Sequence, residues 1–102
     1  MTAPNPIVHS VLLDLDPAEP GLVDDAVASL RSLVALPGVE SLAIGPNTSP
    51  EGLDDGYGHA LVVVFTSAAD RDAYLVAPEH LAAVEVLRRC LRRVIVVDIE
   101  GA

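Results

Sequence analysis

The order of apolar and polar positions divides the chain into four predicted strands and three predicted helices. Runs rich in valine, leucine and isoleucine, each bounded by turn-forming residues, predict strands at residues 7–15, 39–45, 59–65 and 94–99. Apolar residues that recur every three or four positions, together with a capping serine and a helix-starting proline, predict helices at residues 22–34, 68–76 and 78–93. The predicted order of elements is therefore β-α-β-β-α-α-β.

This order predicts a ferredoxin-like α+β fold, with residues 1–102 as a single domain. Two βαβ halves with right-handed crossovers give a four-stranded antiparallel sheet in the order 4-1-3-2, with all helices on one face. A long loop, residues 46–58, replaces a tight hairpin between the second and third strands.

The third predicted strand is apolar on both faces, which predicts a homodimer. An antiparallel sheet with one solvated face would show polar residues on that face, but both faces of 59–65 are apolar apart from His59. The helices can cover one face only, and leaving the other exposed would forfeit several kcal/mol at ~25 cal/mol per Å². The face expected to meet the helices is His59, Leu61 and Val63. The face expected to meet the sheet of a second copy, as in a dimeric α/β barrel, is Ala60, Val62 and Val64.

The charge of the chain makes nucleic acid and membranes poor partners. The formal net charge is -9 and all six basic residues are arginine, so phosphate backbones and anionic lipids would be repelled. The absence of lysine excludes Schiff-base chemistry, and no apolar run approaches the ~20 residues of a membrane span. With one cysteine and no basic leader at the start of the chain, we expect a cytoplasmic protein.

Five segments in order along the chain carry a family resemblance. They are residues 7–13, 45–52, 56–65, 74–80 and 96–98. Together they resemble the Dabb family, the stress-responsive dimeric α/β-barrel proteins. The resemblance implies a homodimer with its two sheets packed face to face, and a pocket between sheet and helices for a small apolar or polyketide-like molecule. One plant member, olivetolic acid cyclase, closes a linear polyketide into a ring.

The resemblance also implies a catalytic pair, Tyr74 and His80, because the cyclase uses a tyrosine on a helix and a histidine just past a proline. Two further pocket histidines of the cyclase correspond to His9 and His59. The chain departs from the cyclase at Ala77, where the cyclase has a histidine, and its first helix lacks the aromatic residues that shape the cyclase tunnel. The plant substrate therefore does not transfer to this chain.

His80 can also be placed without the family. It begins an apolar stripe of the third predicted helix, in the first turn, where the helix dipole and partial burial favour neutral imidazole. A neutral imidazole beside an apolar pocket suits a general base, and the phenol of Tyr74 suits an oxyanion donor. The alternative is structural, with a buried, hydrogen-bonded His80 that locks the helix to the sheet and Tyr74 as core filling.

Other polar and aromatic residues are candidates for lining the pocket. His59 shares a strand face with Leu61, and Tyr57 borders the long loop near the expected pocket mouth. The three histidines of the chain are not spaced as in usual metal sites. We therefore expect neither a metal nor another cofactor.

Three functions remain open. The first is cofactor-free cyclisation or isomerisation beside a carbonyl, with His80 as the base and Tyr74 holding the oxyanion. The second is a non-catalytic stress-responsive or ligand-binding dimer in which the same residues are structural. The third is a cofactor-free oxygenase, which rests on architecture alone.

Overall fold

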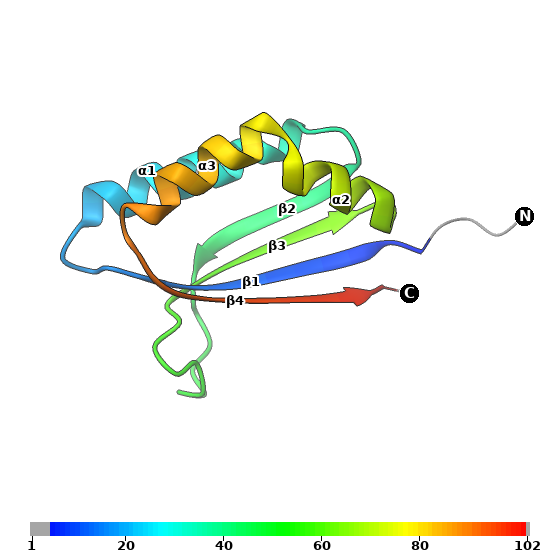
Figure 1. Ribbon diagram of the computed structural model, residues 1–102. Helices are drawn as coiled ribbons and strands as arrows, with labels where there is room; N and C mark the ends of the chain where they lie inside the picture. Colours follow the sequence, from blue (N-terminus) through cyan, green and yellow to red (C-terminus); the bar gives the residue numbers. More distant parts are fainter. Residues whose placement is uncertain (1–4, 102) are drawn as a thin grey trace, which may run out of the picture.

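Four antiparallel strands form one layer and the helices form a second layer on one face of it (Figure 1). The computed structural model describes residues 5–101. The strands are β1 (Ile7–Leu15), β2 (Val39–Pro46), β3 (His59–Phe65) and β4 (Leu91–Glu100). The helices are α1 (Pro20–Arg31), α2 (Ala68–Val76) and α3 (Pro78–Arg88), and a 3-10 turn, η1 (Ser32–Ala35), follows α1.

The strand order β2-β3-β1-β4 confirms the predicted ferredoxin-like fold. None of the helices within residues 5–101 is long and apolar enough to cross a membrane. The expectation that the chain starts without a basic leader concerns mainly residues 1–4, which lie outside the described residues.

Local signals in the sequence place the turns around the helices. The Ser67 hydroxyl accepts a hydrogen bond from the backbone N–H of Asp70 and caps the start of α2. Pro78 stands in the first turn of α3, where its missing N–H leaves no hydrogen bond unmade. Gly38 turns the chain into β2 with a φ of 82°, a left-handed conformation that glycine adopts without strain. A Cβ at Gly38 would also come within 2.5 Å of the Asp70 side chain, so this turn requires glycine.

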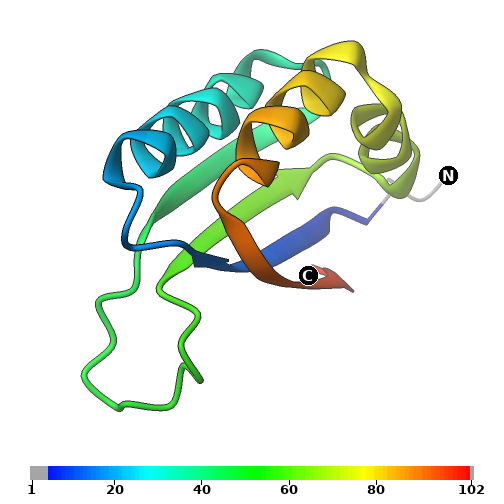
Figure 2. The same cartoon turned by 60° about the vertical axis from the view of Figure 1, so that its left-hand side comes forward.

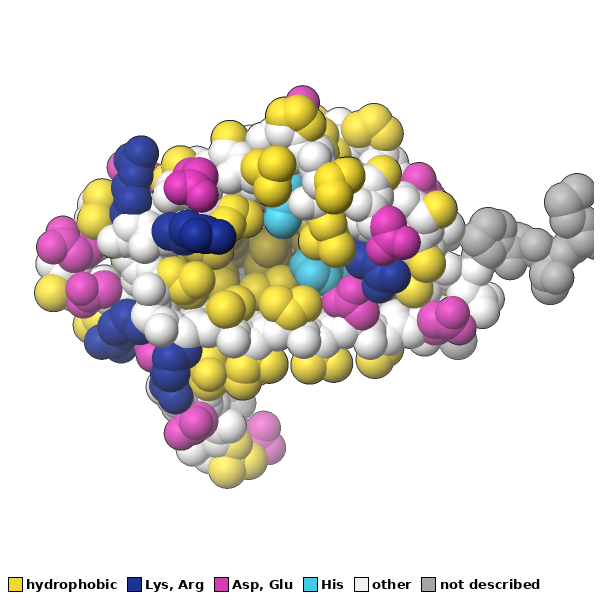
Figure 3. Space-filling model, viewed as in Figure 1, with side chains coloured by type: hydrophobic (Ala, Val, Ile, Leu, Met, Phe, Trp, Pro, Cys, Tyr) yellow, Lys and Arg dark blue, Asp and Glu magenta, His cyan; other side chains and the backbone are white. Residues whose placement is uncertain are grey.

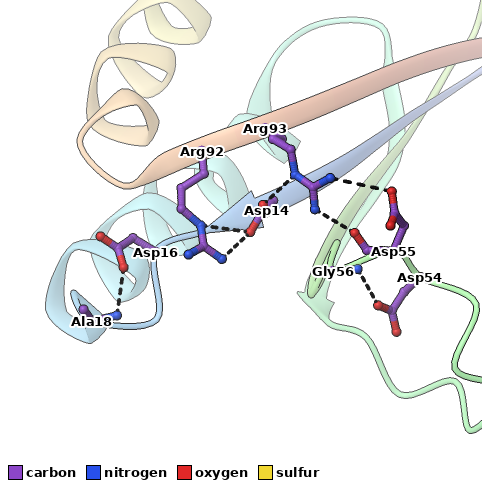
Figure 4. A network of polar contacts seen from close by, with 8 residues as sticks. All are labelled: Asp14, Asp16, Ala18, Asp54, Asp55, Gly56, Arg92 and Arg93. Atoms are coloured by element: carbon purple, nitrogen blue, oxygen red, sulfur yellow. Dashed lines mark hydrogen bonds and ion pairs between the residues drawn. The ribbon is translucent and has the colours of Figure 1, made fainter.

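The boundary between α3 and β4 differs from the prediction. The sequence pattern extends the third helix to Arg93, but α3 ends at Arg88 and β4 begins at Leu91. Arg92 and Arg93 lie on β4, where they bind the buried carboxylate of Asp14 on β1 at 2.7 and 2.8 Å (Figure 4). Hydrogen bonds from Arg93 and Arg92 outweigh burial and lower the pKa of Asp14. Arginine and leucine favour a helix locally, but here Arg92 and Arg93 are on a strand beside β1, which carries Asp14.

The long loop between β2 and β3 is held at the end of the sheet by Arg93. This arginine donates a hydrogen bond to the carbonyl oxygen of Asp55 at 2.6 Å. Its guanidinium group also lies 4.5 Å from the centre of the Tyr57 ring. Figure 1 shows the loop below the sheet, on the side away from the helices. Tyr57 therefore helps to position this loop.

The two faces of the sheet differ in their cover. On the helix side, Leu61 and Val63 of β3 are 3% and 0% exposed, which confirms the predicted inward face at these positions. On the other side, Val62 is only partly buried, and Val97 and Ile99 of β4 are more than half exposed. Figure 1 shows the helices on one side of the sheet only. Within the described chain, an apolar sheet face is therefore left without cover.

Candidate functional site

A cavity of about 500 Å³ lies between the sheet and the helices α2 and α3. Its walls are mainly aliphatic, and they include Val11, Leu61, Val84, Leu87 and Val96. The cavity forms because β4 lies at the margin of the sheet, beyond the cover of α1 and α3 (Figure 2). Figure 3 shows the hollow, with histidine side chains within it. Its volume lies in the range of small-molecule sites, ~300–1,000 Å³.

A histidine–aspartate pair lies at one end of this cavity. The register of β1 and β4 places His9 opposite Asp98, and Nδ1 of His9 is 2.6 Å from a carboxylate oxygen of Asp98. Because a carboxylate accepts hydrogen bonds, Nδ1–H of His9 donates and Nε2 is left as the free ring nitrogen. Arg71 of α2 donates to the other carboxylate oxygen at 2.8 Å. The three side chains thus hold the buried His9 ring in one orientation.

The negative charge of Asp98 is stabilised in the folded chain. Burial raises the pKa of Asp98, but the hydrogen bonds from Arg71 and His9 outweigh this effect, and the pKa lies below its ordinary value. A carboxyl group of this kind stabilises the folded state at any pH above its unfolded pKa. That contribution is lost as the pH falls through the lower, folded pKa.

Replacing Asp98 with asparagine is expected to lower the free energy of unfolding at neutral pH by about 1.5–3 kcal/mol, the usual contribution of hydrogen bonds to a charged group. The difference from the parent chain should shrink as the pH falls below 3.8, the ordinary pKa of the carboxyl group. Urea unfolding at a series of pH values measures it. Asp72→Asn is the matched control, because Asp72 binds the same arginine at 2.8 Å but has a side chain that is 67% exposed. Equal losses in the two variants would contradict the assigned role of Asp98.

Tyr74 of α2 lies between the core and the cavity. Its ring packs edge-on against Phe65 with 4.8 Å between centroids, and it tilts against the ring of His80 at 4.7 Å. Tyr74 is 2% exposed, and its hydroxyl has no hydrogen-bond partner within residues 5–101. Because no fully buried side-chain nitrogen or oxygen in that part of the chain lacks a partner, the hydroxyl is not fully enclosed, and Tyr74 lines the cavity. Burial raises the pKa of Tyr74 to about 12, so the phenol is protonated at neutral pH.

His80 lies in the first turn of α3 and borders the same cavity. Its Nδ1 lies 3.1 Å from the carbonyl oxygen of Leu75, so Nδ1–H donates and Nε2 carries the lone pair of the neutral ring. Burial lowers the pKa of His80 more than the hydrogen bond with Leu75 raises it. Neutral imidazole therefore predominates at neutral pH.

The surroundings of His80 contain features of both interpretations. The hydrogen bond to Leu75 ties α3 to the end of α2, as the structural alternative predicts. The cavity beside the ring is what the catalytic interpretation requires. The hydrogen bond and the proposed chemistry use different ring nitrogens, so the two roles are compatible.

The structure brings four of the candidate site residues together and leaves two elsewhere. Those that line the cavity are His9, Leu61, Tyr74 and His80. Those that do not are His59 and Tyr57, which border a different hollow of about 230 Å³ between the long loop and the sheet.

The antiparallel register of β1 and β3 explains the separation of the two strand histidines. His9 pairs with Val63, whereas His59 pairs with Leu13, farther along β1. His59 therefore lies at the loop end of the sheet, away from the cavity that His9 borders.

Sequence reasoning missed Asp98 and Arg71. Asp98 carries a signal, because it is the one charged residue in the predicted strand 94–99, which the strand order places beside the first strand. Nothing in the sequence indicates the role of Arg71, since its contact with Asp98 joins a helix to a strand 27 positions away.

Among residues 5–101, no group of three or more histidine, cysteine, aspartate or glutamate side chains is arranged to hold a metal ion.

Comparisons with known proteins place the chain among small ferredoxin-like proteins. The sequence matches the family model of the stress responsive A/B barrel domain, Dabb, over residues 7–101. A comparison with curated proteins gave no match. Among solved structures, a dimeric ferredoxin-like protein of unknown function from Jannaschia sp. CCS1 is 30% identical, with a TM-score of 0.83 over 94% of this chain and 99% of that chain.

Two further solved structures share the fold at lower identity. A Dabb family protein with a ferredoxin-like fold from Mesorhizobium loti is 21% identical, with a TM-score of 0.72 over 96% of this chain and 98% of that chain. Hydroxynitrile lyase from Passiflora edulis is 19% identical, with a TM-score of 0.84 over 97% of this chain and 95% of that chain. The family model and the Jannaschia relative both cover nearly all of the described chain. The chain therefore belongs to the Dabb family of stress responsive A/B barrel domains.

Proposed function

We propose that the cavity binds a small, mainly apolar carbonyl compound and that the chain catalyses proton transfer beside the carbonyl without a cofactor. The observation that supports this most directly is the convergence of His80, Tyr74 and His9 on one apolar cavity. In this proposal His80 is the base, and Tyr74 donates a hydrogen bond to the developing oxyanion. His9 and Leu61 bind the substrate.

The proposed reaction begins when Nε2 of His80 takes a proton from the carbon next to the carbonyl group. The electrons of the broken C–H bond form the carbon–carbon double bond of an enolate, and the charge moves to the carbonyl oxygen. The hydroxyl of Tyr74 donates to that oxygen. In isomerisation the substrate is a β,γ-unsaturated carbonyl compound, so deprotonation gives a conjugated dienolate. The dienolate recovers the proton from His80 at its γ carbon, and the double bond moves next to the carbonyl group. In cyclisation the enolate carbon attacks a second carbonyl, whose oxygen takes the proton from His80.

The protonation states of the two residues support these roles. The lowered pKa of His80 keeps a proton acceptor available at neutral pH. The pKa of about 12 keeps Tyr74 a hydrogen-bond donor over the same range. A base and a donor whose environments push their pKa values apart are the usual arrangement for acid–base catalysis.

The relatives support proton transfer as a chemistry suited to this fold. Cleavage of a hydroxynitrile, the reaction that the name of the Passiflora edulis enzyme describes, yields a carbonyl compound and requires proton removal from an oxygen. The resemblance to a cyclising plant member of the family points to a related class of substrate. Both likenesses suggest carbonyl chemistry, and neither assigns a residue of this chain.

We also propose that the chain acts as a cytoplasmic homodimer. The uncovered apolar face of the sheet, which includes the half-exposed Val97 and Ile99, supports a dimer built by packing two sheets together. The Jannaschia relative is described as dimeric, which agrees with this proposal. The cytoplasmic location stays a prediction from the sequence.

The unmodified chain is expected to accelerate the exchange of the α protons of 4-phenylbutan-2-one with D2O. Because the pKa of His80 is lowered from 6.5, the catalysed rate should be constant at neutral pH and should fall as the pH drops through a value below 6.5. Tyr74 remains protonated up to a pH of about 12. Proton NMR measures the rate after subtraction of the hydroxide-catalysed background. Binding of the ketone without any acceleration would contradict catalysis and favour the alternative, a non-catalytic ligand-binding dimer.

A further inference from the structure

We infer that Arg88 selects ligands that carry a carboxylate at the end of the cavity opposite the histidines. This inference rests on the proposed function and names the substrate class of the same site. The ligand would have its reacting carbonyl beside His80 and Tyr74, an apolar middle, and an anionic group at Arg88.

Helix α3 holds the two ends of the site apart. His80 lies in its first turn and Arg88 is its last residue, and eight residues of α-helix span about 12 Å. Both side chains border the same cavity. The opposite wall is β4. Its Asp98 binds His9 at the histidine end, and its first residue, Leu91, is three positions after Arg88 and marks the other end. Helix and strand thus place the polar groups at opposite ends of one hollow.

The wall between the two ends offers no other charged partner. Val84 and Leu87 of α3 and Val94 and Val96 of β4 form this part of the cavity. Figure 3 shows basic side chains beside the hollow, on its left, and apolar side chains between them and the histidines. A ligand that spans this distance therefore needs an apolar middle.

Among the described residues that line the cavity, Arg88 is the one with a positive charge. The chain as a whole carries a net charge of -9 and would repel anions. At the histidine end, Arg71 is already bound to Asp98 and Asp72 at 2.8 Å each.

Arg88, by contrast, has only a weak ion pair within the described chain. Its Nε lies 3.7 Å from Glu85, and the two side chains are 69% and 73% exposed. Such exposed pairs contribute little to stability. The guanidinium group can therefore exchange Glu85 for a ligand carboxylate, which it binds through two parallel N–H groups.

The test compares a charged and an uncharged ligand of equal length, octanoate and octanamide. Each competes with the uncharged fluorophore N-phenyl-1-naphthylamine, which reports occupation of the cavity. In Arg88→Gln, the Kd of octanoate is expected to rise roughly 3- to 10-fold, the loss of one charge-assisted contact, while that of octanamide stays the same. Arg89→Gln is the matched control, because it removes the same charge from the next position, which does not border the cavity. It should change neither Kd.

The outcomes separate this inference from the proposed function. Equal octanoate affinities in Arg88→Gln and Arg89→Gln would overturn the role of Arg88 and leave the cavity as a binding site. Val96→Trp, at a position that is 55% exposed and lines the cavity, should fill it and abolish binding of the fluorophore. Undiminished fluorophore binding in a folded Val96→Trp variant would overturn the cavity itself as the binding site, and the role of Arg88 with it.

Discussion

Replacing His80 with alanine is expected to slow the exchange of ketone α protons by roughly 10²- to 10⁴-fold, the usual contribution of a general base. The substitution removes Nε2, which accepts the proton, and it also removes the hydrogen bond from Nδ1–H to Leu75. Loss of that hydrogen bond should lower the free energy of unfolding by only about 1 kcal/mol. Proton NMR of the exchange reaction and urea unfolding measure the two effects separately.

Two control variants distinguish catalysis from support of the fold. In His80→Asn, the side-chain amide can donate to Leu75 in place of Nδ1–H, so stability should recover while exchange stays slow. His59→Ala makes the same change as His80→Ala at a histidine outside the cavity, and it should leave the exchange rate unaltered. An unaltered exchange rate in His80→Ala, or an equal loss in His59→Ala, would contradict His80 as the base.

The Val62→Asp variant is expected to lose the homodimer and to sediment as a monomer or to aggregate. Val62 lies on the uncovered face of β3, at the centre of the sheet. If two copies pack these faces together, the new carboxylate is buried between them without a partner, at a cost of several kcal/mol. Sedimentation of the unmodified chain should report about twice the chain mass of 10.6 kDa.

Leu81→Asp is the control for this experiment. It places the same charge on α3, at a position that is 54% exposed in the opposite layer of the molecule. The Leu81→Asp variant should remain a dimer if the sheets form the interface. A well-folded monomer of the unmodified chain, or a Val62→Asp dimer as stable as the parent, would contradict sheet-to-sheet pairing.

The elements and their order could be predicted because their signals act over short distances in the chain. The continuous apolar run of β3 was predicted with its observed bounds, His59–Phe65. Ser67 marked the start of α2 because its hydroxyl accepts a hydrogen bond from a backbone N–H three residues on. Pro78 marked the start of α3 because it lacks an N–H, which the first turn of a helix does not need. Right-handed crossovers then left few possible strand orders.

The end of α3 could not be predicted in the same way. Residues 89–93 are arginine, cysteine and leucine, and arginine and leucine favour continuing the helix. Arg92 and Arg93 are extended because Asp14 of the neighbouring strand binds both of them. That carboxylate is 78 positions away from Arg92 in the sequence, so no local pattern contains it.

For the candidate site, local patterns in the sequence were enough to predict which side chains are available and which elements carry them. They placed Tyr74 on the helix before Pro78 and His80 on the helix that Pro78 begins. Periodicity and turn residues carry that information, since each depends on a few neighbouring positions. Two facts about the site come from the folded chain: Asp98 binds both His9 and Arg71, and His59 borders a different hollow. These contacts depend on the register of paired strands and on how far the helices cover the sheet. Both are set by packing between distant segments, which no stretch of the sequence encodes alone.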